Sequence, residues 1–218
     1  MPLSREITDA LEALHYASAS VQAVMNSPAS DNRFSRAMEA LDRLAHEKQI
    51  PIAIVGGLAA IRYGYPAVTE DIDIAIARDQ IPEFLIAAPT YGFEIAWRAE
   101  SDWHTLTHGD VEINVVPEGG KAQDSSPTTI PSPAELGVAE GLDYANLAGW
   151  MELKISSGRR KDQTHVIEVL KKCSEAAIDS IRDHLRRVHD TYLQKLNELA
   201  EEAELERQQE ARRRPPQN

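Results

Sequence analysis

The chain has 218 residues, a length that suits one ordinary domain with helical additions or two small domains. Hydrophobic residues make up 42% of it and charged residues 27%, which is enough for a core and typical of a soluble protein. The formal net charge of −12 argues against a general binder of nucleic acids or membrane surfaces, because the chain as a whole repels phosphate.

Signals for targeting and crosslinking are missing from the sequence. Cys173 is its one cysteine, so no internal disulfide bond is expected. The N-terminal residues MPLSREITDA lack a basic segment followed by an apolar run, and no stretch of about 18 apolar residues exists. We therefore expect a cytoplasmic protein without a signal peptide or a membrane span.

A pair of helices is expected at the N-terminus, within residues 1–48. Residues 3–26 place apolar side chains at helical spacing, and the segment NSPASDN interrupts this pattern. A second helix follows, for which Ser30 or Asp31 is placed as a cap. One face of this helix carries four large apolar side chains, Phe34, Met38, Leu41 and Leu44.

The middle of the chain alternates between strand and helix patterns. The run IPIAIVGG reads as a buried strand that ends in a glycine pair, LAAIRYG as a short helix and IDIAIA as a second strand. The segment DQIPEFLIAAPTYG predicts a helix followed by a turn. Three further strands are expected in FEIAWRAE, DWHTLTHG and DVEINVVPE. The fold class is therefore α/β (α+β), a mixed sheet with flanking helices.

The C-terminal part reads as mainly helical. Residues 117–135 form a long loop rich in Pro, Ser and Thr, and helices are expected from about 142 to 157 and from 162 to 173. From residue 176 an apolar stripe near the heptad period predicts one long helix with a frayed tail.

This stripe has two open interpretations. It packs on the rest of the protein, or it forms a dimer or partner interface. The expected organisation is a helical segment at 1–48, a sheet domain at 49–175 and a helical extension at 176–218.

Two acids mark the second strand. Side chains alternate across a strand, so Asp71 and Asp73 share a face. Carboxylates held together repel each other, and a divalent cation such as Mg²⁺ relieves this repulsion. Upstream, Gly56 and Gly57 allow backbone N–H groups to approach an anion. A solvated strand edge is the alternative for the acids alone, but glycines and acids together suit a metal–triphosphate.

Two segments carry a resemblance to a known family. IVGGLAAIRYGYPAVTEDIDIAI resembles the signature of the nucleotidyltransferase superfamily with the DNA polymerase β-like fold, and Thr69 matches a feature of its bacterial subgroup. LAGWMELKISSGRRKDQTHVIEVLK resembles a segment of the bacterial AbiEii-type toxin group, in which Lys154, Lys161 and Asp162 match. The resemblance covers about residues 49–175.

The resemblance implies transfer of a nucleoside monophosphate from an NTP to a hydroxyl group of RNA, protein or a small molecule. The implied cofactor is Mg²⁺ (or Mn²⁺), held by Asp71, Asp73 and a third carboxylate. Gly56 and Gly57 would cradle the β and γ phosphates. The toxin group implies a toxin–antitoxin or phage-defence role with a cognate antitoxin.

The second segment supplies the implied positive charge. Lys154 and Lys161 would neutralise the triphosphate, and Asp162 would orient one of the two lysines.

The third carboxylate departs from the family pattern. In VEINVVP the family's aspartate position is occupied by Asn114, a neutral ligand that cannot accept a proton. Glu112 lies two residues earlier, hence on the same face, and is the candidate substitute. Ala67 and His165 depart from the pattern as well. A catalytically inactive nucleotidyltransferase fold that binds a nucleotide or a partner is therefore the alternative function.

Other residues allow two interpretations each. His104 and His108 share a strand face and are either metal ligands or ordinary sheet residues. The run GRRK at 158–161 binds phosphate or RNA, or is a solvated charge run. The three tryptophans Trp97, Trp103 and Trp150 are expected in the core, with base-stacking platforms as the alternative, and Cys173 is expected to be buried and inert.

Overall fold

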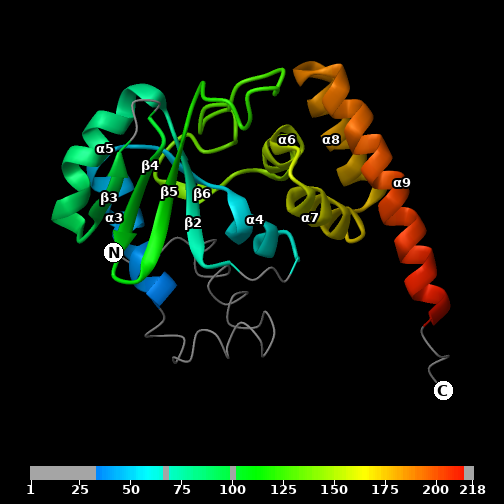
Figure 1. Ribbon diagram of the computed structural model, residues 1–218, viewed down its shortest axis with the longest axis horizontal. Helices are drawn as coiled ribbons and strands as arrows, with labels where there is room; N and C mark the ends of the chain where they lie inside the picture. Colours follow the sequence, from blue (N-terminus) through cyan, green and yellow to red (C-terminus); the bar gives the residue numbers. More distant parts are fainter. Residues whose placement is uncertain (1–32, 66–68, 99–101, 214–218) are drawn as a thin grey trace.

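A computed structural model of the protein describes residues 33–65, 69–98 and 102–213. The helix expected over residues 3–26 and the caps Ser30 and Asp31 lie outside the described residues. The described chain forms a mixed six-stranded sheet with the strand order β3-β4-β5-β2-β1-β6, flanked by helices (Figure 1). The predicted α/β class is therefore confirmed.

The sheet combines parallel and antiparallel neighbours. Its strands are β1 (Ile52–Ile54), β2 (Asp71–Ile76), β3 (Glu94–Arg98), β4 (His104–His108), β5 (Val111–Pro117) and β6 (Leu142–Tyr144). Strand β2 pairs antiparallel with β1 and parallel with β5, and β1 pairs parallel with β6. Strands β3, β4 and β5 pair antiparallel in sequence order. The two central strands β2 and β5 thus run side by side in the same direction.

The described helices divide into two groups (Figure 1). Their bounds are α3 (Arg33–Lys48), α4 (Gly56–Arg62), α5 (Ile81–Ala87), α6 (Leu147–Ser157), α7 (Arg160–Leu170), α8 (Glu175–Val188) and α9 (Asp190–Arg213). Helices α3 and α5 lie with the sheet, whereas α6 to α9 gather on the far side of α4. In α3 the four predicted apolar residues are all buried, as expected.

One face of the sheet forms the core and the other faces outward. Ile72, Ile74 and Ile113 are fully buried, whereas Asp71 and Asp73 are partly exposed. The alternation that the strand pattern predicts is therefore confirmed over residues 71–74, whereas Ala75 and Ile76 are both buried. The polar face is left open for a site.

The helix expected from about residue 142 begins later. Residues Leu142–Tyr144 form strand β6, and α6 starts only at Leu147. The side chain of Asn146 accepts a hydrogen bond from the Gly149 N–H at 2.8 Å and caps the helix. The prediction was wrong because the parallel edge of β1 pairs with this short segment.

The single long helix expected from residue 176 is also wrong. His189 has an extended backbone (φ −166°, ψ 136°) and separates α8 from α9, which then pack on each other. Both helices also contact α6, so Leu185 and Leu196 are fully buried inside the protein. The stripe therefore packs at least partly within the chain, and its role in self-association stays a prediction.

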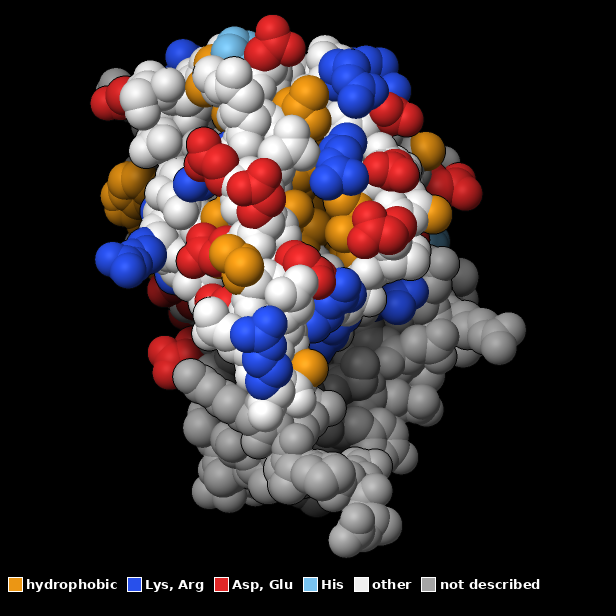
Figure 2. All heavy atoms as spheres, turned by 90° about the vertical axis from the view of Figure 1, so that its right-hand side faces the viewer, with side chains coloured by type: hydrophobic (Ala, Val, Ile, Leu, Met, Phe, Trp, Pro, Cys, Tyr) orange, Lys and Arg blue, Asp and Glu red, His pale blue; other side chains and the backbone are white. Residues whose placement is uncertain are grey.

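The outer surface of this helical group is mixed in character. Figure 2 shows acidic and basic side chains intermingled on the side of α9, with hydrophobic side chains between them. A groove of about 740 Å³ lies among α7, α8 and α9, with Leu170 and Ile178 in its lining. Among the described residues, no helix is long and apolar enough to cross a membrane.

Aromatic burial follows the prediction only in part. Trp150 is fully buried, as expected, but Trp97 on the edge strand β3 is 54% exposed, so the core assignment of Trp97 is wrong. The register between β3 and β4 shifts between Ile95 and Trp97, which marks a bulge. Trp103 and Cys173 are partly buried.

Candidate functional site

A pocket of about 720 Å³ opens on the polar face of the sheet. It lies between the ends of the strands, the start of α4 and the helices α6 and α7. Its lining includes eight of the ten site residues expected from the sequence, namely Gly56, Gly57, Thr69, Asp71, Asp73, Asn114, Lys154 and Lys161. Glu112 and Asp162 are outside this lining. Segments about 100 residues apart in the sequence thus meet at one place.

The parallel pairing of β2 and β5 sets the acidic part of the pocket. Asp71 is in register with Glu112, and Asp73 is in register with Asn114. The Asn114 amide nitrogen lies 3.4 Å from both Asp71 Oδ2 and Asp73 Oδ1. Thr105 donates its hydroxyl to Asn114 Oδ1 at 3.1 Å, which orients this amide. Asn114 therefore contacts both carboxylates, whereas Glu112, in register with Asp71, is exposed and outside the pocket lining.

The two carboxylates are held together at an electrostatic cost. Burial raises the pKa of Asp73, and the neighbouring Asp71 raises it further, against the opposing effect of Lys154. Thr69 donates its hydroxyl to Asp71 Oδ1 at 2.8 Å. Mg²⁺ in proteins uses one or two carboxylates together with water and substrate phosphates. The donor set that the pocket presents therefore fits such an ion.

The glycine pair allows the chain to pass very close to these acids. A Cβ atom on Gly56 would lie 1.8 Å from Asp73 Oδ2, and Gly56 has a φ of +66°. A Cβ atom on Gly57 would lie 2.7 Å from the Thr69 hydroxyl oxygen. Trp150 of α6 donates its indole N–H to the Gly56 carbonyl at 3.1 Å. A side chain at either glycine would fill the space beside the acids.

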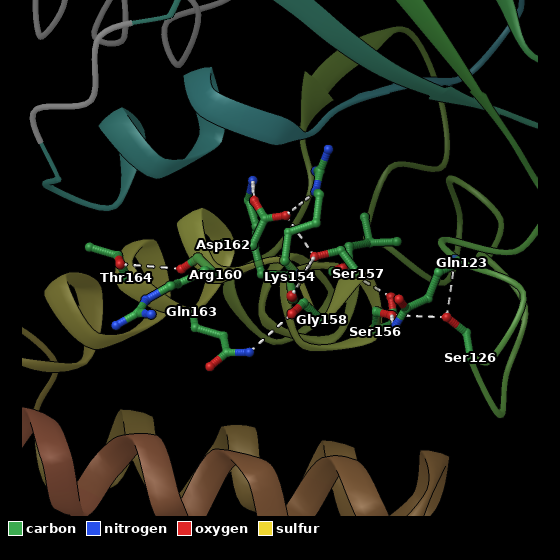
Figure 3. A network of polar contacts seen from close by, with 12 residues as sticks. Gln123, Ser126, Lys154, Ser156, Ser157, Gly158, Arg160, Asp162, Gln163 and Thr164 are labelled. Atoms are coloured by element: carbon green, nitrogen blue, oxygen red, sulfur yellow. Dashed lines mark hydrogen bonds and ion pairs between the residues drawn. The ribbon is translucent and has the colours of Figure 1, made fainter.

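Basic residues line the opposite wall, at the junction of α6 and α7. Lys154 Nζ lies 2.6 Å from Asp162 Oδ1, and both residues are buried. Ser157 and Arg159 donate to Asp162 Oδ2, each at 2.6 Å. Figure 3 shows Lys154 and Ser157 converging on Asp162. Asp162 therefore fixes Lys154, while Lys161 is exposed at the pocket.

The charges in this network compensate each other. Burial alone would raise the pKa of Asp162, but the charge of Lys154 and the hydrogen bonds to Asp162 hold that pKa below its usual value. Asp162 thus remains ionised and supports the lysine.

Several pocket residues are not among the ten expected from the motifs. Arg159 lines the pocket and belongs to the GRRK run, so that run was the signal for it. Trp97, Trp103 and Thr105 also line the pocket, but no motif marks them. Only the strand register places Trp97 and Thr105 on the polar face.

The histidine pair gives no support to a metal site. His104 is buried, whereas the His108 ring packs against Phe93 at 5.1 Å between ring centroids. Within the described residues, no group of three or more His, Cys, Asp or Glu side chains is close enough together to hold a metal.

Known proteins give only a distant comparison. No family model matches the chain, and no curated protein matches it. The solution structure of the antibiotic-resistance factor ANT(2″)-Ia is 14% identical, with 82% of this chain and 96% of that chain covered and a TM-score of 0.39. Its crystal structure with adenylyl-2″-tobramycin is 12% identical, with 79% and 95% covered and a TM-score of 0.36.

A CCA-adding enzyme in complex with ATP is similar as well. It is 14% identical, with 85% of this chain and 49% of that chain covered and a TM-score of 0.40. Scores at this level do not decide a family. The resemblance to the nucleotidyltransferase superfamily and to its AbiEii-type group therefore rests on the sequence motifs.

Proposed function

We propose that the protein is a nucleotidyltransferase that moves a nucleoside monophosphate from an NTP to an acceptor hydroxyl with the help of Mg²⁺ (or Mn²⁺). The observation that carries this proposal is the close approach of Gly56 to Asp73, in one pocket with the basic residues of α6 and α7. Glycine backbone, paired carboxylates and fixed cations are the three components that a metal–triphosphate requires.

Each group of residues has a distinct task in this reaction. Asp71 and Asp73 hold the ion, and Gly56 and Gly57 leave room for the β and γ phosphates. When bound, the ion would neutralise phosphate charge and stabilise the charge that develops in the transfer. Arg159 and Lys161 line the pocket and would compensate the charge of the departing pyrophosphate.

The transfer balances as a substitution at phosphorus. The acceptor oxygen attacks the α-phosphorus, and the bond from that phosphorus to the bridging oxygen breaks. Pyrophosphate leaves with the electron pair, and the hydroxyl proton passes to water. The residues of the pocket position these groups and supply charge rather than forming a covalent bond.

The biological setting is proposed from the sequence resemblance alone. It is that of an AbiEii-type component of a cytoplasmic toxin–antitoxin or phage-defence system, with a cognate antitoxin as partner. The acceptor class is RNA, protein or a small molecule.

A second function is favoured by a specific observation. The Asn114 amide donates toward both carboxylates, and Glu112 lies outside the pocket. An amide in this place cannot accept a proton from an acceptor hydroxyl. The alternative is a nucleotide-binding module of the same fold that does not transfer.

Calorimetric titration of each NTP, with and without Mg²⁺, tests the site. We expect Mg²⁺-dependent binding by the wild type and its loss in Asp71→Ala/Asp73→Ala. The matched control is Asp79→Ala/Glu83→Ala, which removes two exposed acids elsewhere and should bind normally. Absence of binding for every NTP would contradict both proposed functions.

Pyrophosphate release separates the two functions. The wild type is incubated with MgNTP and, in separate reactions, with total RNA, a cytosolic protein fraction and a metabolite fraction. Release in any of these reactions, absent from the aspartate double variant, supports transfer. NTP binding without release in any of them supports the binding module.

A further inference from the structure

Four side chains form a row across the open face of the sheet. Asp73 pairs with Asn114, Asn114 with Thr105 and Thr105 with Trp97, on the consecutive strands β2, β5, β4 and β3. Paired residues of neighbouring strands point to the same face, and all four line the pocket. Three strand spacings of about 4.8 Å place Trp97 roughly 14 Å from Asp73 across the sheet.

A second row runs beside the first. Asp71 pairs with Glu112, Glu112 with Thr107 and Thr107 with Glu94. Glu94 and Glu112 are exposed on the same face as Trp97. All members of both rows are described, and their ionisable side chains are carboxylic acids only.

The strand order separates the two sides of the carboxylate pair. Gly56 follows β1 and helix α6 follows β6, so both come from one side of β2. The two rows extend to the other side, over β5, β4 and β3. The pocket is thus basic and glycine-lined on one side of Asp73 and aromatic on the other, where the exposed Glu94 and Glu112 lie on the same sheet face but outside the pocket lining.

If the proposed transfer holds, this division indicates on which side of Asp73 the acceptor binds. An in-line displacement puts the attacking and leaving oxygens on opposite sides of the phosphorus. The pyrophosphate belongs with the glycines and the basic residues. The acceptor oxygen therefore approaches from the side of Asn114 and Thr105, and the rest of the acceptor extends toward Trp97.

We propose that this row is the acceptor site and that its substrate is a small, positively charged, ring-bearing alcohol. Trp97 is 54% exposed and offers a flat face to a ring or a cation. Glu94 and Glu112 attract positive charge and repel a polyanion. The same repulsion disfavours RNA and other acidic acceptors.

The test compares two short sugars that differ in charge. A glucosamine trimer is cationic and a galacturonate trimer is anionic, and both carry rings and hydroxyls. Each is titrated calorimetrically into the full chain, without nucleotide and with Mg²⁺ plus an ATP analogue that has a methylene group between the α and β phosphates. We expect the glucosamine trimer to bind at least tenfold more tightly than the anionic trimer.

Variants locate the binding on the row. Trp97→Ala should weaken glucosamine-trimer binding about tenfold, because stacking and cation–π contacts are lost. Ile86→Ala removes an 80% exposed side chain of α5 and should have no effect. Glu94→Gln/Glu112→Gln should weaken binding and reduce its salt dependence, whereas Glu39→Gln/Glu83→Gln should not.

The failures of the two proposals are distinguishable. Intact Mg²⁺-dependent NTP binding with no glucosamine-trimer binding, or with equal binding of the anionic trimer, would overturn the acceptor site alone. Binding of tRNA that Trp97→Ala weakens would overturn the cationic acceptor class in favour of RNA. Trimer binding that Trp97→Ala leaves unchanged would place the sugar elsewhere and overturn the row.

Discussion

Two polar clusters, one around Asp73 in the pocket and one around Asp162 outside its lining, have opposite surroundings. Asp162 is fully buried, but it has Lys154, Ser157 and Arg159 as partners. Asp73 has another acid beside it and only a long contact from an amide. The pKa of Asp162 is accordingly lowered, and that of Asp73 is raised.

From this difference we infer that the cluster around Asp162 is structural and that the one around Asp73 binds a ligand. The charges around Asp162 are compensated within the protein, so this cluster serves to fix Lys154. Lys154 offsets the charges of Asp71 and Asp73 only in part, and we infer that a bound cation completes the compensation. Residues of the same type thus have different tasks, and the partner set decides which.

Removing the charge of Asp162 should have the largest effect. Asp162→Asn leaves Lys154 buried without its anion, which costs about 3–5 kcal/mol in the free energy of unfolding. Urea titration measures this change. The control Asp179→Asn breaks an exposed ion pair with Arg182 and should cost about 0.5 kcal/mol or less. Equal effects for both variants would contradict a structural role for Asp162.

A side chain at Gly56, beside the acidic pair, should have the second-largest effect on stability. Gly56→Ala places a Cβ atom against Asp73, and we expect it to cost about 2–4 kcal/mol and to abolish Mg²⁺-dependent NTP binding. Gly109→Ala is the matched control, because Gly109 has a similar φ of +61° and a Cβ atom added there would meet nothing within 4 Å. That control should cost about 1–2 kcal/mol and leave NTP binding intact.

A third acid at position 114 should increase the repulsion within the cluster of Asp71 and Asp73. Asn114→Asp should lower stability by about 1–3 kcal/mol in metal-free buffer, because an amide donor becomes a further negative charge. Mg²⁺ should then raise the melting temperature of this variant more than that of the wild type. Asn197→Asp on α9 is the control. If Mg²⁺ leaves the melting temperature of Asn114→Asp unchanged, the pocket does not hold the ion.

The smallest effect expected is a difference in pH dependence. A raised pKa means that folded Asp73 binds its proton more tightly than the unfolded chain, so stability falls as pH rises from the usual value of 3.8 through the raised value. Asp73→Asn should therefore stabilise the metal-free protein above this range and have little effect below it.

Asp162 should show the opposite sign. Its pKa is lowered, so its contribution is present above 3.8 and is lost as pH falls through the lowered value. Urea titrations of Asp73→Asn, Asp162→Asn and the wild type across pH 3 to 8 compare the two. Parallel pH profiles for the two variants would contradict the contrast.

The sequence predicts the acidic cluster better than its surroundings. Alternation in β2 places Asp71 and Asp73 on one face, and the glycine pair identifies the turn beside them. Both are local patterns, so they are readable without the fold. The position of Trp97 depends on a bulge and on the register of an edge strand, which no local pattern encodes.

The C-terminal helices and the strand β6 before them are also hard to predict from local sequence. Three residues of β6 are too few for a recognisable strand period, and only the free edge of β1 gives them a partner. His189 is not a residue that ends helices by itself, so the apolar stripe continues past the point where the chain turns. Tertiary packing decides both features.

The hydrogen bond from Trp150 to Gly56 gives the pocket a dependence on folding order. It joins residues 94 positions apart, and the pairing of β6 with β1 closes a loop of similar length. Contacts at such separation form late, because the entropy of loop closure is lost before the contacts compensate for it. A nascent chain that has emerged only to residue 141 carries both glycines and both aspartates, yet it has no finished pocket.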